Sequence, residues 1–595
     1  MQRSIMKTHL FSAVVLLIIS PVILADVPLS VTRKPDVPYF MDQFIFRTIE
    51  LSLFSSDVTG MVTDDYGDLM WNPAYLSKIQ KRSIYLDLNF GNSFTTGQTV
   101  SPYYTSADYL VYPSWYQQTY ISGVQTTPLY NLAILLPITE KLTVGIINRS
   151  LFDYGPFRET YYWDYRYLET NSYMDYSAIM DDLEPQRLEV DDNQQSLYGF
   201  QTDVMLAYQL NKRLDLGLKI GNYIYRREGE LYDSKWGFYP HSSFADLNDE
   251  QLDINGDQYT LGFGLLYHSN AKTTLGVYGE LITGNSTEES VSLDSSYSWS
   301  ERDTDSDYFS FYDYDLASDQ TYNAEARRPS WTITYEKNIS DKLTFRSFLK
   351  QSGCKTDIGF GTSSEDTSFS DRTYDTYNNS SYYFQRLTSH RANRQHFSGE
   401  GQENSSQWKW FASLIYRTDN DWSLFGGIQI NKYHSEKEYH EESDYYSKSD
   451  NNYQYYSPHT NSYLNTHEKY YEYTSESDQY IVSVPIGIKA RVIKGFYLIL
   501  GGEMHYYLTD GWEKGRQLYP EVISKRWENG TLIVNDLEED RYEEYSSNPA
   551  KDFTRNTNVN VGFAYKHPSG INLYVRSNGN IMETAGWNLG FEYRW

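Results

Sequence analysis

The chain has 595 residues and a formal net charge of −28 at neutral pH, from 79 acidic and 51 basic side chains. An acidic excess of this size disfavours binding to nucleic acid or to an anionic membrane surface through bulk charge. Cys354 is the only cysteine, so no disulfide can form within the chain, and the 59 tyrosines are the most unusual feature of the composition.

Residues 1–25 have the pattern of a secretory signal peptide. Arg3 and Lys7 precede an apolar run from Leu10 to Leu24, and Ala25 ends a tolerable cleavage site. The other interpretation is an uncleaved anchor helix, for which the run is short. Beyond Ala25 the sequence has no apolar stretch of about 18 residues, which excludes helical membrane spans. We therefore expect an exported protein that is either soluble or a β-barrel.

After the leader, the strongest signal is alternation with period two. In residues 83–90 apolar side chains alternate with polar ones, which gives a strand one apolar and one polar face. Residues 203–210 and 214–221 repeat the pattern around a tight turn, which predicts an antiparallel hairpin. Further pairs cover residues 128–138 and 142–150, 257–268 and 273–284, 330–338 and 342–352, 407–417 and 421–433, 479–492 and 496–508, and 557–566 and 570–577. With a first strand at residue 83 and a last strand over 586–595, the pattern predicts 16 strands.

Long polar segments separate the hairpins. They are acidic and rich in tyrosine, serine and threonine, and they cover residues 151–199, 285–328, 352–406, 434–478 and 509–555. Tight turns that alternate with long loops are typical of outer-membrane barrels, whereas a soluble β-sandwich has no reason for so regular a difference. The sequence thus predicts an all-β fold: a transmembrane antiparallel up-and-down β-barrel of about 16 strands, with short periplasmic turns and long acidic, tyrosine-rich extracellular loops.

Charged side chains within the expected strands fall on one face. A charge on the lipid-facing side costs up to about 2–4 kcal/mol at mid-membrane, so charges of both signs on the opposite face indicate a polar lumen. We expect the lumen-facing charges to include Asp215, Lys219, Arg346, Lys489, Arg491 and Glu503.

The last strand carries aromatic side chains at alternate positions, Phe591, Tyr593 and Trp595. Aromatic residues at the last position and at the third from last resemble the C-terminal signal that the barrel-assembly machinery recognises in outer-membrane proteins. We therefore expect residues 83–595 to form a barrel that this machinery inserts among the lipid and lipopolysaccharide of a Gram-negative-type outer membrane.

Residues 64–76, Asp-Asp-Tyr-Gly-Asp-Leu-Met-Trp-Asn-Pro-Ala-Tyr-Leu, stand shortly before the first strand. An acidic pair followed by Asn-Pro-Ala-x-Leu is similar to a segment of the OMPP1/FadL/TodX hydrophobic-compound transporters and of the related PorV-type barrels. In that family the segment belongs to an N-terminal hatch inside the barrel, and the barrel has 14 strands, which is the alternative to our count. The resemblance implies that residues 26–82 form a hatch, with Asn72, Pro73 and Ala74 where the chain enters the wall.

These features favour a passive or gated transporter or porin for small or hydrophobic solutes. Two alternatives stay open: a surface scaffold that displays acidic loops to a partner, and a plain diffusion porin. The sequence has no nucleophile elbow, Walker loop or His-Glu-x-x-His motif, so we expect neither an enzyme nor a cofactor. Divalent cations at the loops are a possible further ligand, because residues 253–257 and 303–307 carry oxygen ligands at calcium-like spacing.

Overall fold

The structure is a computed structural model. It describes residues 60–89, 95–107, 110–122, 128–155, 161–166, 187–239, 242–302, 306–378, 381–418, 422–454, 458–546, 550–577 and 587–595. The expected signal peptide and residues 26–59 of the expected hatch lie outside these ranges. Within them, no helix has both the length and the apolar character needed to cross a membrane.

The described chain begins with two short 3-10 helices and continues almost entirely as strands. The helices are η3 (Asp68–Met70) and η4 (Pro73–Lys78). The strands are β1 (Ser83–Asn89), β2 (Thr95–Ala107), β3 (Leu110–Ser122), β4 (Pro128–Pro137), β5 (Leu142–Gly155), β6 (Tyr161–Arg166), β7 (Arg187–Asn211), β8 (Leu214–Tyr239), β9 (Ser242–Asn270), β10 (Thr273–Arg302), β11 (Ser306–Ser340), β12 (Leu343–Asn378), β13 (Ser381–Arg417), β14 (Ser423–Gln454), β15 (His459–Ile493), β16 (Phe496–Glu528), β17 (Thr531–Ser546), β18 (Ala550–Lys566), β19 (Ile571–Ser577) and β20 (Trp587–Arg594).

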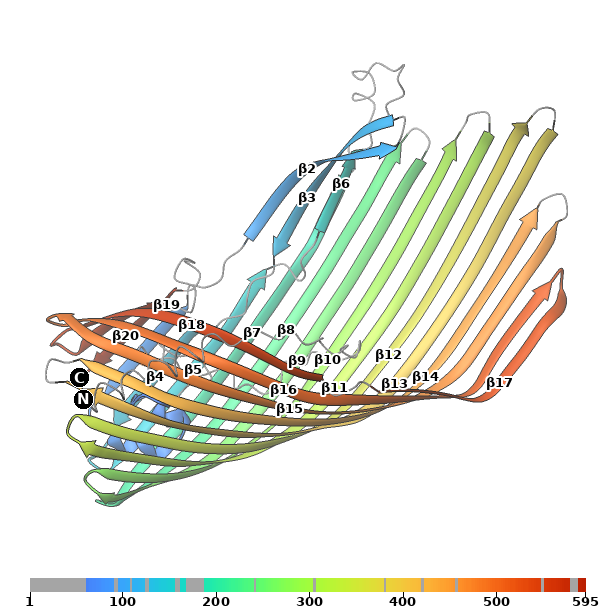
Figure 1. The fold of residues 1–595 in the computed structure, drawn as a ribbon. Helices are drawn as coiled ribbons and strands as arrows, with labels where there is room; N and C mark the ends of the chain where they lie inside the picture. Colours follow the sequence, from blue (N-terminus) through green and yellow to red (C-terminus); the bar gives the residue numbers. More distant parts are fainter. Residues whose placement is uncertain are drawn as a thin grey trace, which may run out of the picture.

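Sixteen strands of the described ranges close into one antiparallel ring (Figure 1). Its order is β1, β4, β5, β7 to β16, β18, β19 and β20, and β20 returns to β1 with Leu86 opposite Phe591. β17 pairs only with part of β16, and β2, β3 and β6 form a separate sheet. Closure leaves the ring without an edge, so every strand has partners on both sides, as a membrane requires. The predicted barrel and its count of 16 strands are confirmed.

The outward side chains of the ring form an apolar band. In β8 and β9, Ile220, Leu261 and Phe263 are each more than half exposed, while Asp215 and Lys219 on the opposite face of β8 are buried. Exposed apolar surface costs roughly 25 cal/mol per Å² in water but is at no disadvantage in hydrocarbon. The band therefore marks the membrane-spanning part of the barrel, and the period-two pattern of the sequence is confirmed.

Aromatic side chains border the apolar band. Trp331 and Trp408 meet edge to face with ring centroids 5.7 Å apart, and Trp410 donates a hydrogen bond of 3.1 Å to Ser347. At the end of the chain the rings of Tyr593 and Trp595 stack at 5.3 Å. Rings with an apolar body and a polar edge suit the boundary between hydrocarbon and headgroups.

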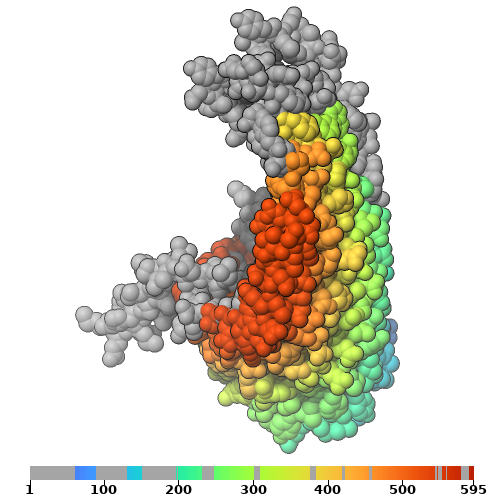
Figure 2. All heavy atoms as spheres, turned by 90° about the vertical axis from the view of Figure 1, so that its right-hand side faces the viewer, coloured from blue at the N-terminus to red at the C-terminus, as the bar shows by residue number. Residues whose placement is uncertain are grey.

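The strands of one side of the barrel continue far beyond the apolar band (Figure 1). β13 has 37 residues and β15 has 35, whereas about 9–11 suffice to cross a membrane. The segments that the sequence suggested as long loops are thus largely strand, because alternating Ser, Thr and Tyr residues pair well across neighbouring strands. We call the parts of β10–β15 at residues 285–302, 306–326, 356–378, 381–403, 437–454 and 459–475 the wall. Figure 2 shows it from the side, as a curved sheet.

Candidate functional site: the N-terminal segment in the lumen

Residues 60–82, which we call the N-terminal segment, pack against the inner face of the barrel. η4 contacts β5, β7, β8 and β9, and Ala74 and Leu76 have no exposed surface. Trp71 meets the rings of Phe348 and Phe411 edge to face, each at 5.4 Å. The main hydrophobic core of the described chain therefore lies between this segment and the inner side of the barrel, not between two sheets.

Asn72 makes three hydrogen bonds, one within the segment and two to the barrel. Its Oδ1 accepts from the Ala74 N–H at 2.9 Å, which caps η4, and Pro73 occupies the first turn. Its Nδ2 donates to the carbonyl oxygens of Leu265 and Val277, each at 3.2 Å. Leu265 and Val277 are cross-strand partners in β9 and β10, so one amide group joins the helix cap to two strands. Only a side chain that both accepts and donates can do this.

Three glycines on neighbouring strands leave the space that the Asn-Pro-Ala turn occupies. A Cβ atom on Gly217 of β8 would lie 2.3 Å from the Ala74 nitrogen, and one on Gly264 of β9 would lie 2.0 Å from Asn72 Oδ1. On Gly276 of β10 it would lie 2.3 Å from Thr334 Oγ1 and 3.1 Å from Asn72 Nδ2. We call these glycines the glycine seat. These glycines were not among the site residues predicted from the sequence, although each is a small residue in an otherwise alternating strand.

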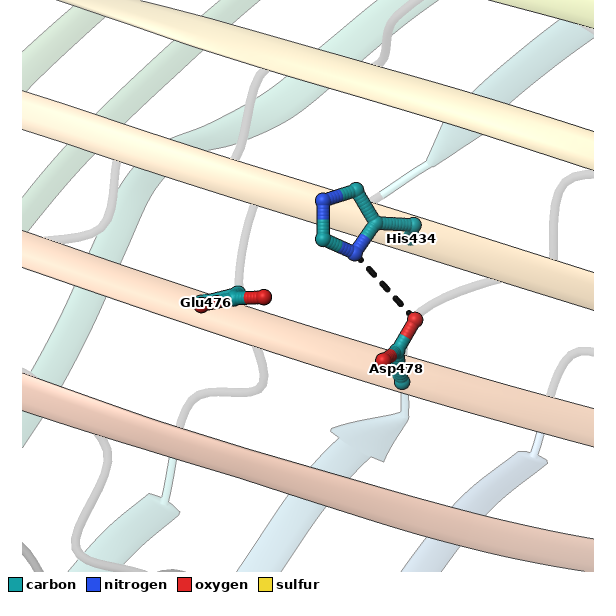
Figure 3. A group of neighbouring side chains, drawn as sticks. All are labelled: His434, Glu476 and Asp478. Atoms are coloured by element: carbon teal, nitrogen blue, oxygen red, sulfur yellow. Dashed lines mark hydrogen bonds and ion pairs between the residues drawn. The ribbon is translucent and has the colours of Figure 1, made fainter.

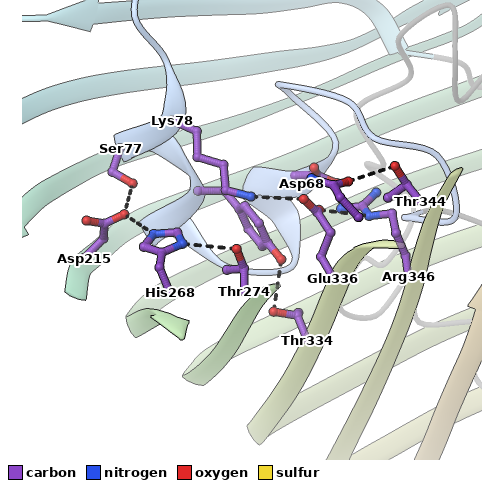
Figure 4. A network of polar contacts seen from close by, with 12 residues as sticks. Asp68, Ser77, Lys78, Asp215, His268, Thr274, Thr334, Glu336, Thr344 and Arg346 are labelled. Carbon is purple, nitrogen blue, oxygen red and sulfur yellow. Dashed lines mark hydrogen bonds and ion pairs between the residues drawn. The ribbon is translucent and has the colours of Figure 1, made fainter. Parts of the chain in front are cut away.

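Arg346 of β12 is the second anchor of the segment (Figure 4). This fully buried side chain donates to the carbonyl oxygens of Gly60 and Val62 at 2.8 and 2.7 Å and to Asp68 Oδ1 at 2.8 Å. Glu336 lies 3.3 Å from Arg346 Nε on the other side. Burial raises the pKa of the Asp68 carboxyl to about 6, although Arg346 opposes the shift. A buried guanidinium with all these partners ties the segment to the barrel more firmly than a surface ion pair would.

A smaller polar cluster joins η4 to β8, β9 and β11 (Figure 4). Ser77 donates to Asp215 Oδ2 at 2.6 Å, and His268 Nε2 lies 2.9 Å from the same oxygen. Tyr75 donates to Thr334 Oγ1 at 3.1 Å. Two of the charges expected in the lumen, Asp215 and Arg346, thus contact the N-terminal segment directly.

The last strand also holds the segment. Tyr66 donates to Glu592 Oε1 at 2.8 Å, and Arg594 lies 2.9 Å from Asp65 Oδ2. Glu592 faces inward, while Phe591, Tyr593 and Trp595 are 37, 38 and 45% exposed on the outward face. The strand that carries the expected assembly signal on its outer side therefore contacts the N-terminal segment with its inner side.

The other charges expected in the lumen lie away from the segment. Lys219 pairs with Glu280 at 3.0 Å, and Lys489 lies 5.6 Å above the ring of Tyr497. Glu503 lies 3.0 Å from His505 Nε2. Arg491 is opposite Tyr497 in the β15–β16 pairing and is exposed.

A different cluster, on the outward face beyond the apolar band, has residue types that bind metal ions. His434 of β14 lies beside Glu476 and Asp478 of β15, with ligand atoms within 4.8 Å of one another (Figure 3). His434 Nδ1 is 3.2 Å from Asp478 Oδ1, and the Lys432 ammonium is 3.3 Å from the same oxygen. Because Lys432 already supplies the positive charge, we describe this cluster as an ion-pair network.

The structure describes all of the first calcium-like stretch, residues 253–257, and only part of the second, residues 303–307. In the first, Asp253 accepts a hydrogen bond from Asn255 at 2.6 Å, and Asp257 pairs with Arg226 at 3.2 Å. These carboxylates therefore have partners within the chain. In the second, Asp303 and Asp305 lie outside the described residues. Binding of divalent cations stays a prediction.

Comparison with known proteins gives a likeness to solved structures alone. No protein-family model matches the sequence, and no curated protein matches it significantly. A Pseudomonas aeruginosa FadL homologue is 11% identical over 90% of this chain and 95% of its own, with a TM-score of 0.28. The P. putida toluene transporter TodX is 11% identical over 91% and 97%, with a TM-score of 0.28. The CymD monoaromatic hydrocarbon channel is 11% identical over 62% and 91%, with a TM-score of 0.22.

FadL and TodX carry the names of the family that residues 64–76 resemble. TM-scores of 0.28 are too low to support a further step.

Proposed function

We propose that the protein is a gated transporter for small hydrophobic solutes in the outer membrane of a Gram-negative-type bacterium, with the N-terminal segment as its hatch. The observation that carries the proposal is the way this segment is held. Side chains such as Asn72, Arg346 and Asp215 hold it in the lumen, and no described residue from 60 to 82 forms a ladder of strand pairing with the barrel. Side-chain contacts of this kind can break and reform without breaking the backbone hydrogen bonds between strands.

The chemistry of the interface supports an apolar cargo. Met61, Leu69 and Trp71 of the segment pack against Phe348 and Phe411 of the barrel. If the segment shifts, these side chains line the space it leaves, and an apolar solute there loses less hydration than a polar one. The ion pairs and hydrogen bonds around this apolar centre then serve to close the hatch again.

The experiment that tests the hatch is a conductance measurement in planar bilayers. Deletion of residues 26–82 removes the segment and leaves the first strand, which begins at Ser83, in place. We expect a larger single-channel conductance than for the full chain, because the lumen loses its contents. Equal conductance for the two proteins would contradict a hatch.

Solute entry is tested in cells with an intact outer membrane. The apolar dye N-phenylnaphthylamine fluoresces when it reaches lipid, and toluene, the solute named for TodX, serves as its competitor. We expect the full chain to speed dye entry and excess toluene to slow it. Entry no faster than in cells without the protein would contradict transport of apolar solutes.

The wall favours a second candidate function, a surface scaffold. β11, β12 and β13 each have more than 30 residues and continue beyond the apolar band, which transport of a small solute does not require. Shortening the β12–β13 hairpin at residues 356–403 and the β14–β15 hairpin at 437–475 should then abolish binding to the partner and leave dye entry unchanged. If dye entry falls with the hairpins, the wall belongs to the transport path instead.

A further inference from the structure

The two faces of the wall differ in charge. In β11, Asp313, Asp315, Asp319 and Glu325 all point outward and are exposed. The inward positions of β11 between residues 310 and 326 carry no charge. The inner face of the other wall strands carries charges of both signs, such as Asp366, Arg391 and Lys437, so it lacks the acidic excess of the outward face of β11. The difference points to what the inner face contacts.

Serine hydroxyl groups are frequent on the inner face of β10 in the wall. In β10, Ser286, Ser290, Ser292 and Ser296 lie at inward positions, and Glu288 and Asp294 lie between them. The hydroxyl of serine both donates and accepts hydrogen bonds and carries no charge. A row of such groups suits a ligand whose own surface consists of neutral donors and acceptors.

Two aromatic rings lie against glycine backbone on the inner face of the wall, at 67° to each other. A Cβ atom on Gly399 of β13 would lie 2.4 Å from Phe360 Cζ, and one on Gly401 would lie 2.2 Å from Tyr439 Cδ1. The two rings therefore cover glycine backbone, and both side chains stay partly exposed on the side away from it. Their centroids are 6.4 Å apart, and Tyr473 stacks on Tyr439 at 5.9 Å.

Fixed polar groups border the rings. Glu403 accepts hydrogen bonds from the Tyr439 hydroxyl and from the Lys437 ammonium. Tyr473 donates to Glu513 Oε2 at 3.0 Å. The carboxylate of Glu403 has two oxygens and more acceptor sites than these two donors fill, so it can accept from a ligand hydroxyl as well.

We propose that the inner face of the wall binds a neutral carbohydrate chain, with sugar rings stacked on Phe360 and Tyr439. A sugar ring has apolar C–H faces and a rim of hydroxyls, so it suits aromatic surfaces beside groups such as Glu403 that accept hydrogen bonds. A cationic peptide would prefer the acidic outward face, and an anionic polymer is repelled by a chain of net charge −28. This surface lies in the wall and includes no residue of the N-terminal segment.

The full chain, purified in a detergent without a sugar headgroup, is titrated with maltoheptaose, cellohexaose and laminarihexaose by calorimetry. We expect at least one of them to bind. Tyr439→Ala should weaken that binding at least tenfold, because the stacking surface is lost, whereas Tyr439→Phe should keep it within about threefold. Tyr470→Ala is the matched control, since Tyr470 is a tyrosine of β15 that points outward and is 40% exposed.

Folding of each variant is checked by the heat-dependent gel migration of the intact barrel. If Tyr439→Ala does not fold, Phe360→Leu takes its place, because leucine retains apolar volume and removes the ring. The proposal is overturned if none of the three saccharides binds, or if Tyr470→Ala weakens binding as much as the inward variants. Dye entry through the lumen should be the same in all variants, which separates this result from failure of the proposed transport.

Discussion

The side-chain oxygen of Asn72 occupies the place where Gly264 would carry a Cβ atom, 2.0 Å from it. Gly264→Ala therefore pushes the Asn-Pro-Ala turn off the glycine seat without changing the charge of the lumen. We predict a larger single-channel conductance for this variant, approaching that of the chain without residues 26–82. Gly279→Ala in β10 is the control, because a Cβ there meets nothing within 4 Å. An unchanged conductance for Gly264→Ala would show that the seat does not hold the segment.

Substitutions of Asn72 separate its two tasks. Asn72→Asp keeps the oxygen that caps η4 but loses the donors to Leu265 and Val277 and places a negative charge beside their carbonyl oxygens. We expect it to destabilise the seated segment more than Asn72→Ala does, since a buried polar group without a partner costs about 1–3 kcal/mol and a charge more. Hydrogen exchange of residues 60–82 measures the effect. Equal protection of residues 60–82 from hydrogen exchange in Asn72→Asp and in the parent protein would contradict this account.

Removing the charge of Arg346 should also release the segment. Arg346→Met leaves the buried Asp68 without its guanidinium, and losing one partner of a buried pair costs about 3–5 kcal/mol. The second substitution Asp68→Asn should restore part of the protection, because the uncompensated charge is gone. Hydrogen exchange in the two single variants and the double variant gives the coupling energy. Strictly additive losses would mean that the two residues act separately.

The retention of the N-terminal segment in the lumen should depend on pH through Asp68. This carboxyl group pairs with Arg346, which also lies beside Glu336. Its pKa in the seated segment is raised to about 6, above the ordinary 3.8 of a free aspartate. Asp68 thus binds its proton more tightly when the N-terminal segment is packed in the lumen than when it is released. Protonation of Asp68 therefore stabilises the packed state fully below pH 3.8, and this stabilisation is lost as the pH rises through 6. We predict that opening events become more frequent from about pH 5 to about pH 7. The Asp68→Asn channel should not respond over this range, and an equal response would assign the effect to another group.

The barrel was predictable from the sequence because its cause is local. Apolar residues alternate with polar ones along each strand, so Ile220 and Asp215 could be assigned to opposite faces without knowledge of their neighbours. The ends of the strands were not predictable in the same way. Whether the polar stretch in residues 352–406 becomes loop or strand depends on pairing with the next strands, which a single stretch of sequence does not contain.

The site was predictable only in part, for the same reason. The likeness of residues 64–76 to a hatch motif drew attention to Asn72, and the parity of the strands placed Arg346 in the lumen. Arg346 and its partner Asp68 are far apart in the sequence, and so are Asn72 and the glycine seat. Gly264, for example, comes 192 residues after Asn72. Contacts over such distances follow from the closed ring, and so they become visible only when the ring is built.

A reversible disulfide tests most directly whether the N-terminal segment must leave its place for transport. Ser77 and Asp215 meet side chain to side chain at 2.6 Å, and Cys354 is replaced by serine so that no other thiol is present. In Ser77→Cys/Asp215→Cys, the account predicts that oxidation stops entry of the apolar dye and that a reductant restores it, while each single variant responds to neither. Dye entry at the full rate with the disulfide closed would contradict the account.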